Sequence, residues 1–367
     1  MTELDSLLEG LRCTGKPIIG CLPLYPPLEL FHSMGFNPII LWGTEQQATT
    51  TPESDKHVQA FACSVGRRLV ESVLSSNGLP LDCLFSYNAC DTLRNLPEIL
   101  AHGLDEKGSQ VPFLHIHVPM NGIYQDLGAA YLKNQIETLE RQLESIFGIP
   151  FSPEAFAGSI ELYRKLRSLT GTLGEQVARG AMPFSDYAGL VQAGYLRPVE
   201  DQIEVLTTAL DRANGMVTDQ AGRGILLSGI LPPPKPVCDA IEQDGLTIVA
   251  NDIAAIHRSV LHTPGGVLDP GEYYVDFYKN HCPCPTLLYT ADNRLDHLLA
   301  LIDSTGATGV IFLGEKFCEY EYFEFPFIEK QLKERGINVL ALETSIDAVD
   351  SIAPVQNRID AFAELFQ

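Results

Sequence analysis

Short runs of apolar residues alternate with stretches of helical periodicity through the first third of the chain. The near-continuous apolar runs are typical of buried strands, and the stretches between them repeat apolar positions every three to four residues, as helices do. The predicted strands are Pro17–Leu24, Pro38–Gly43, Leu81–Tyr87 and Val111–Val118, and the predicted helices are Pro27–Gly35, His57–Ser76 and Thr92–Leu104. This alternation predicts a parallel sheet with helices on both faces.

The pattern changes after residue 125. Two long stretches, Ala130–Ile146 and Pro153–Thr170, have helical periodicity with charged residues on the opposite face. A second alternating series follows, with predicted strands Gly224–Ile230, Leu246–Ala250, Gly309–Leu313 and Asn338–Leu342 and predicted helices Lys235–Gln243, Asp292–Ser304, Glu324–Arg335 and Val355–Phe366. The chain is therefore predicted to have two α/β domains, residues 1–125 and 221–367, joined by a helical insert of residues 126–220.

The amino-acid composition is typical of a globular protein, and the net charge limits the classes of partner that the protein can bind. Of the 367 residues, 45% are hydrophobic and 20% charged, which excludes a disordered or fibrous chain. The net charge of −22 repels nucleic-acid backbones and anionic membrane surfaces. No stretch approaches the roughly 18 apolar residues of a membrane span, and the N-terminus lacks a secretory signal pattern. We expect a cytoplasmic protein that binds neither nucleic acid nor membrane.

Several common catalytic motifs are absent from the sequence. No G-x-x-x-x-G-K-[ST] phosphate loop occurs, and no G-x-G-x-x-G follows the first strand of either series. Neither a G-x-S-x-G elbow nor an H-E-x-x-H zinc helix is present. The chain is therefore not expected to hydrolyse ATP through a P-loop or to be a common serine or zinc hydrolase.

The nine cysteines are the feature that composition leaves unexplained. An odd number in a cytoplasmic protein argues against a disulfide scaffold. Cys90 follows the third predicted strand and Cys318 follows Gly309–Leu313, and ligands gather beyond the carboxyl ends of parallel strands. Cys63 falls within a predicted helix. Thiolates at helix N-termini are good soft ligands, whereas most buried cysteines act as small apolar residues. We interpret Cys13, Cys83 and Cys238 as core residues.

The spacing of these cysteines excludes familiar metal motifs. Structural zinc sites usually show pairs of C-x-x-C, and ferredoxins show C-x-x-C-x-x-C runs; neither occurs. Cys63, Cys90 and Cys318 could share a ligand only if the fold brings them together between the two domains. From position alone, a core role and a ligand role remain equally open for these three.

At these residues the chain resembles the 2-hydroxyacyl-CoA dehydratase and benzoyl-CoA reductase family. The resemblance covers nearly the whole chain, and its pieces occur in the family's order. They are P-x-E-L at Pro27, Glu29 and Leu30, the Cys63 helix, Cys90-Asp91, Phe317-Cys318, and a terminal Q-x-R-x-x-A-F-x-E at Gln356, Arg358, Ala361, Phe362 and Glu364. The terminal pattern is the most specific of these elements.

The resemblance implies two Rossmann-like parallel-sheet domains with a helical insert between them and an iron–sulfur cluster at their interface. It implies that Cys63, Cys90 and Cys318 bind a [4Fe-4S] cluster, with one iron lacking a cysteine. Such enzymes receive low-potential electrons from a separate ATP-hydrolysing iron–sulfur activator protein, and use them for radical dehydration of a thioester or for reduction of an aromatic ring. A homodimer, or a heterodimer with a homologous subunit, is expected.

Two alternatives stay open. One branch of the family holds a double-cubane [8Fe-9S] cluster and reduces small molecules without CoA; Cys21, Cys282 and Cys284 could add three ligands for it. The absence of a Lys/Arg cluster that could bind the phosphates of CoA counts mildly against a CoA substrate. The alternative from another class is a cluster carrier or scaffold without turnover.

Two residues beside the end of the first strand are candidate proton donors. Tyr25 and Glu29 lie near the carboxyl end of Pro17–Leu24, where catalytic groups of α/β proteins gather. Glu29 could equally cap the next helix or pair with an arginine. The sequence leaves the catalytic and the structural interpretation open.

Overall fold

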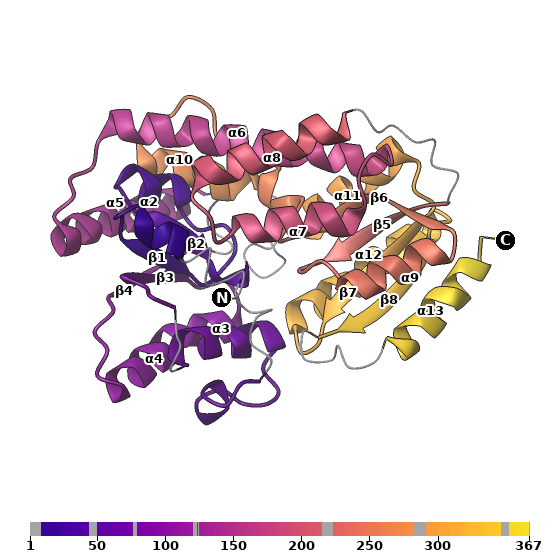
Figure 1. Cartoon of the computed structure of the whole chain (residues 1–367), viewed down its shortest axis with the longest axis horizontal. Coiled ribbons are helices and arrows are strands. Elements are labelled where there is room, and N and C mark those ends of the chain that lie inside the picture. Colours follow the sequence, from indigo (N-terminus) through magenta and orange to yellow (C-terminus); the bar gives the residue numbers. More distant parts are fainter. Residues whose placement is uncertain are drawn as a thin grey trace.

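Two four-stranded parallel sheets form the framework of the protein. The computed structural model describes residues 9–43, 50–75, 79–119, 123, 125–214, 223–281, 291–345 and 352–366. The first sheet has the strand order β2-β1-β3-β4 and the second has β6-β5-β7-β8. If the strands of each sheet are numbered separately in chain order, both sheets have the same strand order, 2-1-3-4. Figure 1 shows the first sheet on the left and the second on the right.

The first half of the chain supplies the first sheet and its helices. Its elements are β1 (Ile18–Cys21), α2 (Leu28–Ser33), β2 (Asn37–Ile40), α3 (Ser64–Leu74), β3 (Cys83–Tyr87), α4 (Asp91–Glu106) and β4 (Phe113–Ile116). Every residue of β1 and β3 is buried. Because both faces of these central strands are covered, their residues are mostly apolar, which explains why their sequences do not alternate between apolar and polar positions.

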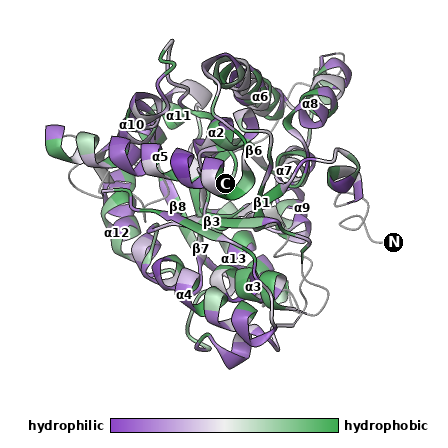
Figure 2. Ribbon diagram, turned by 90° about the vertical axis from the view of Figure 1, so that its left-hand side faces the viewer, coloured by the Kyte–Doolittle hydropathy of each residue, from purple (hydrophilic) through white to green (hydrophobic). Residues whose placement is uncertain are grey.

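The second half repeats the arrangement. Its elements are β5 (Arg223–Gly229), α9 (Lys235–Gln243), β6 (Leu246–Ile253), α10 (Pro270–Asn280), α11 (Ala291–Thr305), β7 (Gly309–Glu315), α12 (Glu319–Glu334), β8 (Asn338–Thr344) and α13 (Ala353–Glu364). All seven residues of β7 are buried. In Figure 2 the strands at the centre are largely hydrophobic, and polar residues lie on the outer faces of the surrounding helices.

Four helices separate the two series of strands along the chain: α5 (Asp126–Phe147), α6 (Pro153–Ala178), α7 (Phe184–Gly194) and α8 (Val199–Ala213). The long helix α6 packs against α2 of the first half and against β6 of the second. In Figure 1 it runs, with α8, along the top of the molecule over both sheets. The helical segment therefore connects the two halves in space as well as in sequence.

The α/β prediction is confirmed for the described residues, and several element boundaries were wrong. The second strand ends at Ile40 and continues as a short 3-10 turn, Leu41–Gly43. Helix α3 begins at Ser64, not at residue 57, and α12 begins at Glu319, not at residue 324. Helices α7, α8 and α10 were not distinguished individually from the sequence. The domain limits at residues 125 and 220 stay a prediction. Helix α10, from the second half of the chain, packs on α5.

No helix in the described parts of the chain combines the length and the apolar character needed to span a membrane.

Candidate functional site

Three of the predicted site cysteines each stand immediately before a helix. Cys63 precedes α3, Cys90 precedes α4 and Cys318 precedes α12. The thiol of Cys90 accepts a hydrogen bond from the backbone N–H of Leu93, 3.4 Å away. Helix N-termini present unpaired N–H groups and the positive end of the helix dipole, which favour a thiolate over a thiol. The expectation that Cys63 lies within a helix was wrong, since it caps one.

The structure brings these three cysteines together around two cavities. A cavity of about 360 Å³ is lined by all three together with His57, Phe61, Asp91 and Tyr320, among others. A smaller one of about 40 Å³ is also lined by all three, with Leu24, Trp42, Tyr87, Ile230 and Glu315. Phe61 on the larger cavity is 70% exposed, whereas Trp42 and Tyr87 on the smaller one are buried. The cysteines thus separate an outer, partly polar cavity from an inner, mostly apolar one.

Glu315 connects the two halves of the protein at this point. It is the last residue of β7, and its side-chain Oε1 accepts hydrogen bonds from the backbone N–H of Ser64, at 3.2 Å, and from the Ser64 hydroxyl. The backbone N–H of Glu315 in turn donates to Oε2 of Glu321, at 3.2 Å. The helix that follows Cys63 and the strand that precedes Cys318 are therefore joined directly.

Two features of the backbone next to Cys318 and Cys63 help to determine where their thiols lie. Phe317, just before Cys318, has a φ of +66°, in the left-handed region that bulky residues rarely adopt. On the other side, a Cβ added to Gly66 would lie 2.6 Å from Cγ2 of Thr92 and 3.7 Å from Sγ of Cys63. Glycine at this position lets the first turns of α3 and α4 approach each other closely.

The donor set fits an iron–sulfur cluster better than a single metal ion. Within the described ranges, no three His, Cys, Asp or Glu side chains are arranged to hold a metal ion between them. A cubane is larger than an ion, so its ligands surround a space instead of converging on a point. Three thiols around two adjoining cavities match that requirement, and cysteine thiolates are the usual ligands of such clusters.

The other cysteines do not join this group. Cys21 is fully buried and lines neither cavity; burial, and then the neighbouring Cys83, hold the pKa of its thiol well above the usual value. Burial also raises the pKa of Cys83 and of Cys238 to about 12, in agreement with a core role for both. Cys13 is exposed, so its predicted core role was wrong. The candidate ligands Cys282 and Cys284 lie outside the described residues.

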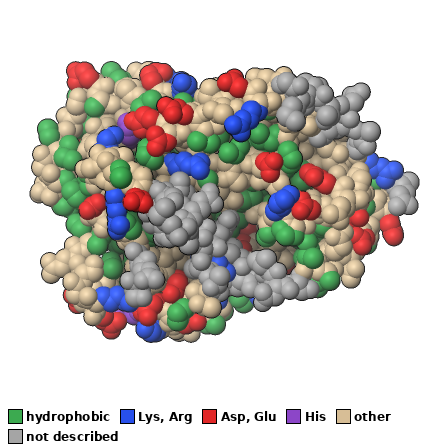
Figure 3. All heavy atoms as spheres, viewed as in Figure 1, with side chains coloured by type: hydrophobic (Ala, Val, Ile, Leu, Met, Phe, Trp, Pro, Cys, Tyr) green, Lys and Arg blue, Asp and Glu red, His purple; other side chains and the backbone are tan. Residues whose placement is uncertain are grey.

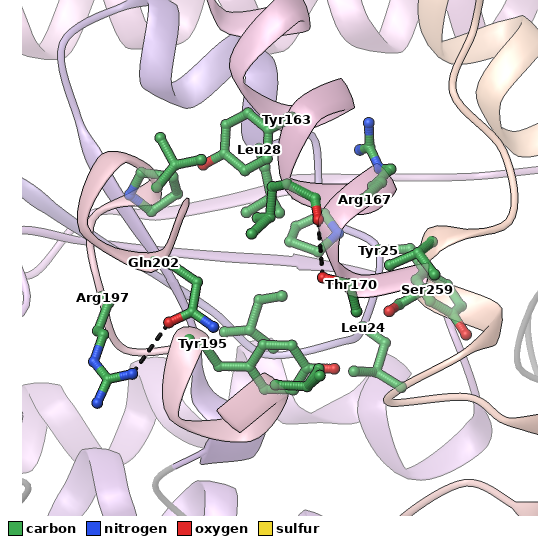
Figure 4. Close-up of a pocket in the computed structure, with 18 of the residues that line it drawn as sticks. Leu24, Tyr25, Leu28, Tyr163, Arg167, Thr170, Tyr195, Arg197, Gln202 and Ser259 are labelled. Atoms are coloured by element: carbon green, nitrogen blue, oxygen red, sulfur yellow. Dashed lines mark hydrogen bonds between the residues drawn. The ribbon is translucent and has the colours of Figure 1, made fainter. Parts of the chain in front are cut away.

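Of the two candidate proton donors, Tyr25 lines a different cavity, and Glu29 does not line it. Figure 4 shows this space of about 100 Å³, which is lined by Tyr25, Tyr163, Arg167, Tyr195 and Arg197, among others, and by many apolar side chains. Leu24 lines both this cavity and the inner cavity of the cysteines. The hydroxyl of Tyr25 donates a hydrogen bond to the carbonyl oxygen of Ala254, 2.8 Å away.

Glu29 is fully buried and surrounded by donors. Its Oε1 accepts hydrogen bonds from Arg167 and from the hydroxyl of Tyr273, at 3.0 Å, and its Oε2 accepts one from the hydroxyl of Tyr274, at 2.9 Å. These partners come from α6 and α10, so the carboxylate joins three helices. This geometry supports the arginine-pairing alternative left open by the sequence.

Some residues of the site carried no signal in the sequence. Ser64 and Glu315 are 251 positions apart, and neither belongs to a local motif. The one available hint for Glu315 is its place as a charged residue ending a fully apolar strand. Trp42 lies in a turn that was predicted to be part of a strand, which obscured its position at the inner cavity.

Comparisons with known proteins identify the family of the chain. The family model for the 2-hydroxyglutaryl-CoA dehydratase D-component matches residues 23–366. The (R)-phenyllactyl-CoA dehydratase beta subunit of Clostridium sporogenes is 24% identical, over 98% of this chain and 94% of that protein. The (R)-2-hydroxyglutaryl-CoA dehydratase subunit beta of Acidaminococcus fermentans is 25% identical, over 98% and 95%. A benzoyl-CoA reductase subunit of Thauera aromatica is 23% identical, over 95% and 90%. The chain therefore belongs to the 2-hydroxyglutaryl-CoA dehydratase D-component family.

Proposed function

We propose that this chain is an iron–sulfur subunit of a dehydratase or reductase, and that Cys63, Cys90 and Cys318 hold a [4Fe-4S] cluster. The observation that carries the proposal is that these three residues, from both halves of the chain, line the same two cavities. When bound, such a cluster supplies single electrons at low potential to a substrate.

The residues around the thiols have definable tasks in this proposal. The N-termini of α3, α4 and α12 stabilise thiolate charge, and the Leu93 N–H donates directly to the sulfur of Cys90. Hydrogen bonds to cluster sulfurs and exclusion of solvent both tune a cluster's potential. Trp42, Tyr87 and Ile230 exclude water on the inner side.

Partner proteins follow from the same proposal. Several relatives are named as subunits, three of them as beta subunits, which supports a second, homologous subunit, with a homodimer as the alternative. Because the sequence has no phosphate loop, the energy for electron delivery would come from a separate ATP-hydrolysing activator protein.

The substrate is proposed to be small or thioester-linked. The names of the relatives favour a CoA thioester. On the face in Figure 3, Lys and Arg side chains are scattered among Asp and Glu and form no single basic patch. A CoA tail would therefore be held by individual guanidinium or ammonium groups, of which Arg197 on the cavity in Figure 4 is one candidate.

A double cubane remains the second candidate cofactor. It would require further thiolates, and Cys21 is a poor candidate because its thiol is buried, lines neither cysteine cavity and has a raised pKa. The position of Cys21 favours the single cubane.

Metal analysis after anaerobic purification tests the proposal. About four irons and four sulfides per chain are expected for a cubane. Cys63→Ser, Cys90→Ser and Cys318→Ser should each lose the iron, while the matched variant Cys238→Ser should keep it. About eight irons would favour the double cubane, and an iron-free protein would refute both clusters. A reduced cluster that no CoA thioester oxidises, with activator and ATP present, would favour a carrier or scaffold without turnover.

A further inference from the structure

We propose that Glu315 and Ser64 form a positioning pair that holds Cys63 and Cys318 in register across the two halves of the protein, and that the Glu315 carboxylate lowers the reduction potential of whatever redox group these cysteines bind. The inference rests on the proposed function and adds two residues to the site.

The first support is the geometry of the pair. Oε1 of Glu315 accepts two hydrogen bonds from one residue, from the backbone N–H of Ser64 at 3.2 Å and from its hydroxyl. Ser64 directly follows Cys63, so the bonds fix the backbone that carries the thiol. Both residues are buried, and hydrogen bonds to a buried carboxylate are stronger than neutral ones.

The second support is the way Glu315 holds Cys318. The backbone N–H of Cys318 donates to the carbonyl oxygen of Glu315 at 2.9 Å. The backbone N–H of Glu315 donates to Oε2 of Glu321, three residues beyond the cysteine, at 3.2 Å. Contacts with Glu315 therefore fix the backbone on both sides of Cys318. Glu315 also accepts hydrogen bonds from Ser64, the neighbour of Cys63.

The third support is the charge. The inner cavity is lined by Pro23, Leu24, Trp42, Cys63, Val65, Gly66, Tyr87, Ala89, Cys90, Leu93, Ile230, Glu315 and Cys318. Among these described lining residues Glu315 is the one acidic side chain, and none of the other lining side chains is basic. A negative charge in such an environment is poorly screened, so it opposes the arrival of an electron nearby.

The test compares Glu315→Gln and Ser64→Ala with a matched control, Glu71→Gln. Glu71 also lies on α3, is buried, and accepts two backbone N–H bonds, from Glu53 at 2.8 Å and Ser54 at 3.0 Å. It lines neither cysteine cavity. Each Glu→Gln substitution keeps one accepting oxygen and removes the charge of a buried carboxylate that accepts two hydrogen bonds, so only the place differs.

Two measurements are made on each protein. In the iron-free protein, dibromobimane links neighbouring thiols, and peptide mapping quantifies the Cys63–Cys318 product. That yield should fall about tenfold in Glu315→Gln and in Ser64→Ala, in line with the worth of a hydrogen bond to a charged group, and stay unchanged in Glu71→Gln. In the iron-loaded protein, redox titration followed by EPR should give a higher midpoint potential in Glu315→Gln than in wild type.

The outcomes separate this inference from the proposed function. If wild type binds iron but Glu315→Gln matches it in both cross-linking and potential, the positioning pair is refuted and the iron–sulfur proposal stands. If Glu315→Gln does not fold, Ser64→Ala, which keeps the carboxylate, decides the positioning role through cross-linking. If wild type binds no iron, the proposed function fails, whatever the cross-linking shows.

Discussion

Glu29 and Arg167 form an ion pair in the interior of the protein, between α2 and α6, with the guanidinium donating to Oε1 of the carboxylate. Tyr273 and Tyr274 donate their hydroxyls to the same carboxylate from α10. A carboxylate held by three donors from two other helices is suited to fixing the packing of these helices.

We therefore expect Glu29→Gln to destabilise the protein. The substitution leaves Arg167 buried without its partner charge, which typically costs about 3–5 kcal/mol. Urea unfolding measures the loss. Glu200→Gln is the control, because Glu200 pairs with His32 at 3.2 Å from a side chain that is 47% exposed, and an exposed pair is worth about 1 kcal/mol or less. Unchanged stability of Glu29→Gln with lost turnover would instead favour the proton-donor role.

The cysteines should differ sharply in their reactivity. Burial raises the pKa of Cys83 and Cys238 to about 12, and that of Cys21 well above its usual value, so few of these thiols are thiolates at pH 8. Iodoacetamide attacks thiolates. In the folded, iron-free protein it should alkylate Cys63, Cys90, Cys318 and the exposed Cys13 at least about a hundred times faster than the three buried cysteines. Peptide mass spectrometry resolves the sites. Equal labelling of Cys83 and Cys90 would contradict the assignment.

The sheets could be predicted from the sequence because several of their strands contain an uninterrupted run of apolar residues. A run such as Gly309–Leu313 is long enough to form a strand and too short for a core helix, and its burial on both faces is a property of the run itself. The same reasoning placed Cys90 and Cys318 beyond strand ends, where the structure has them. The sequence pattern alone was sufficient to predict the elements whose stabilising contacts are local or are made by apolar side chains.

The start of α3 could not be predicted, because a distant contact sets it. The backbone N–H of Ser64 donates to Glu315, 251 positions away, so the first turn of the helix is satisfied from the other half of the chain. Nothing in residues 57–63 reports that contact. Glu29 shows the same limit: its partners Arg167, Tyr273 and Tyr274 are known only once the helices have packed.

Gly66→Ala should disturb the cysteine site through packing alone. The new Cβ would lie 2.6 Å from Cγ2 of Thr92, a β-branched side chain with little freedom to move. Overpacking of this kind costs about 1–3 kcal/mol, and we expect iron content to fall with stability because the Cys63 thiol is 3.7 Å from the same Cβ.

A second substitution provides the control for this overpacking. Thr92→Ser removes the clashing methyl group, so the double variant Gly66→Ala/Thr92→Ser should recover both thermal stability and iron. Gly158→Ala, where nothing lies within 4 Å of the added Cβ, should have no such effect. Failure of Thr92→Ser to restore either property would show that the clash is not the cause.

Stability should depend on pH through His257. Burial, and then the neighbouring His297, lower the pKa of His257 to about 4 in the folded protein; the two rings stack with centroids 5.4 Å apart. Between pH 6.5 and pH 4 the unfolded chain therefore binds a proton that the folded protein does not, so stability falls as pH is lowered through this range, by about 2–3 kcal/mol. His257→Phe keeps an aromatic ring and removes the titration, so its free energy of unfolding should fall less steeply with acidification than that of wild type. Chemical denaturation at several pH values compares the two slopes, and parallel curves between pH 4 and 6.5 would contradict the assignment.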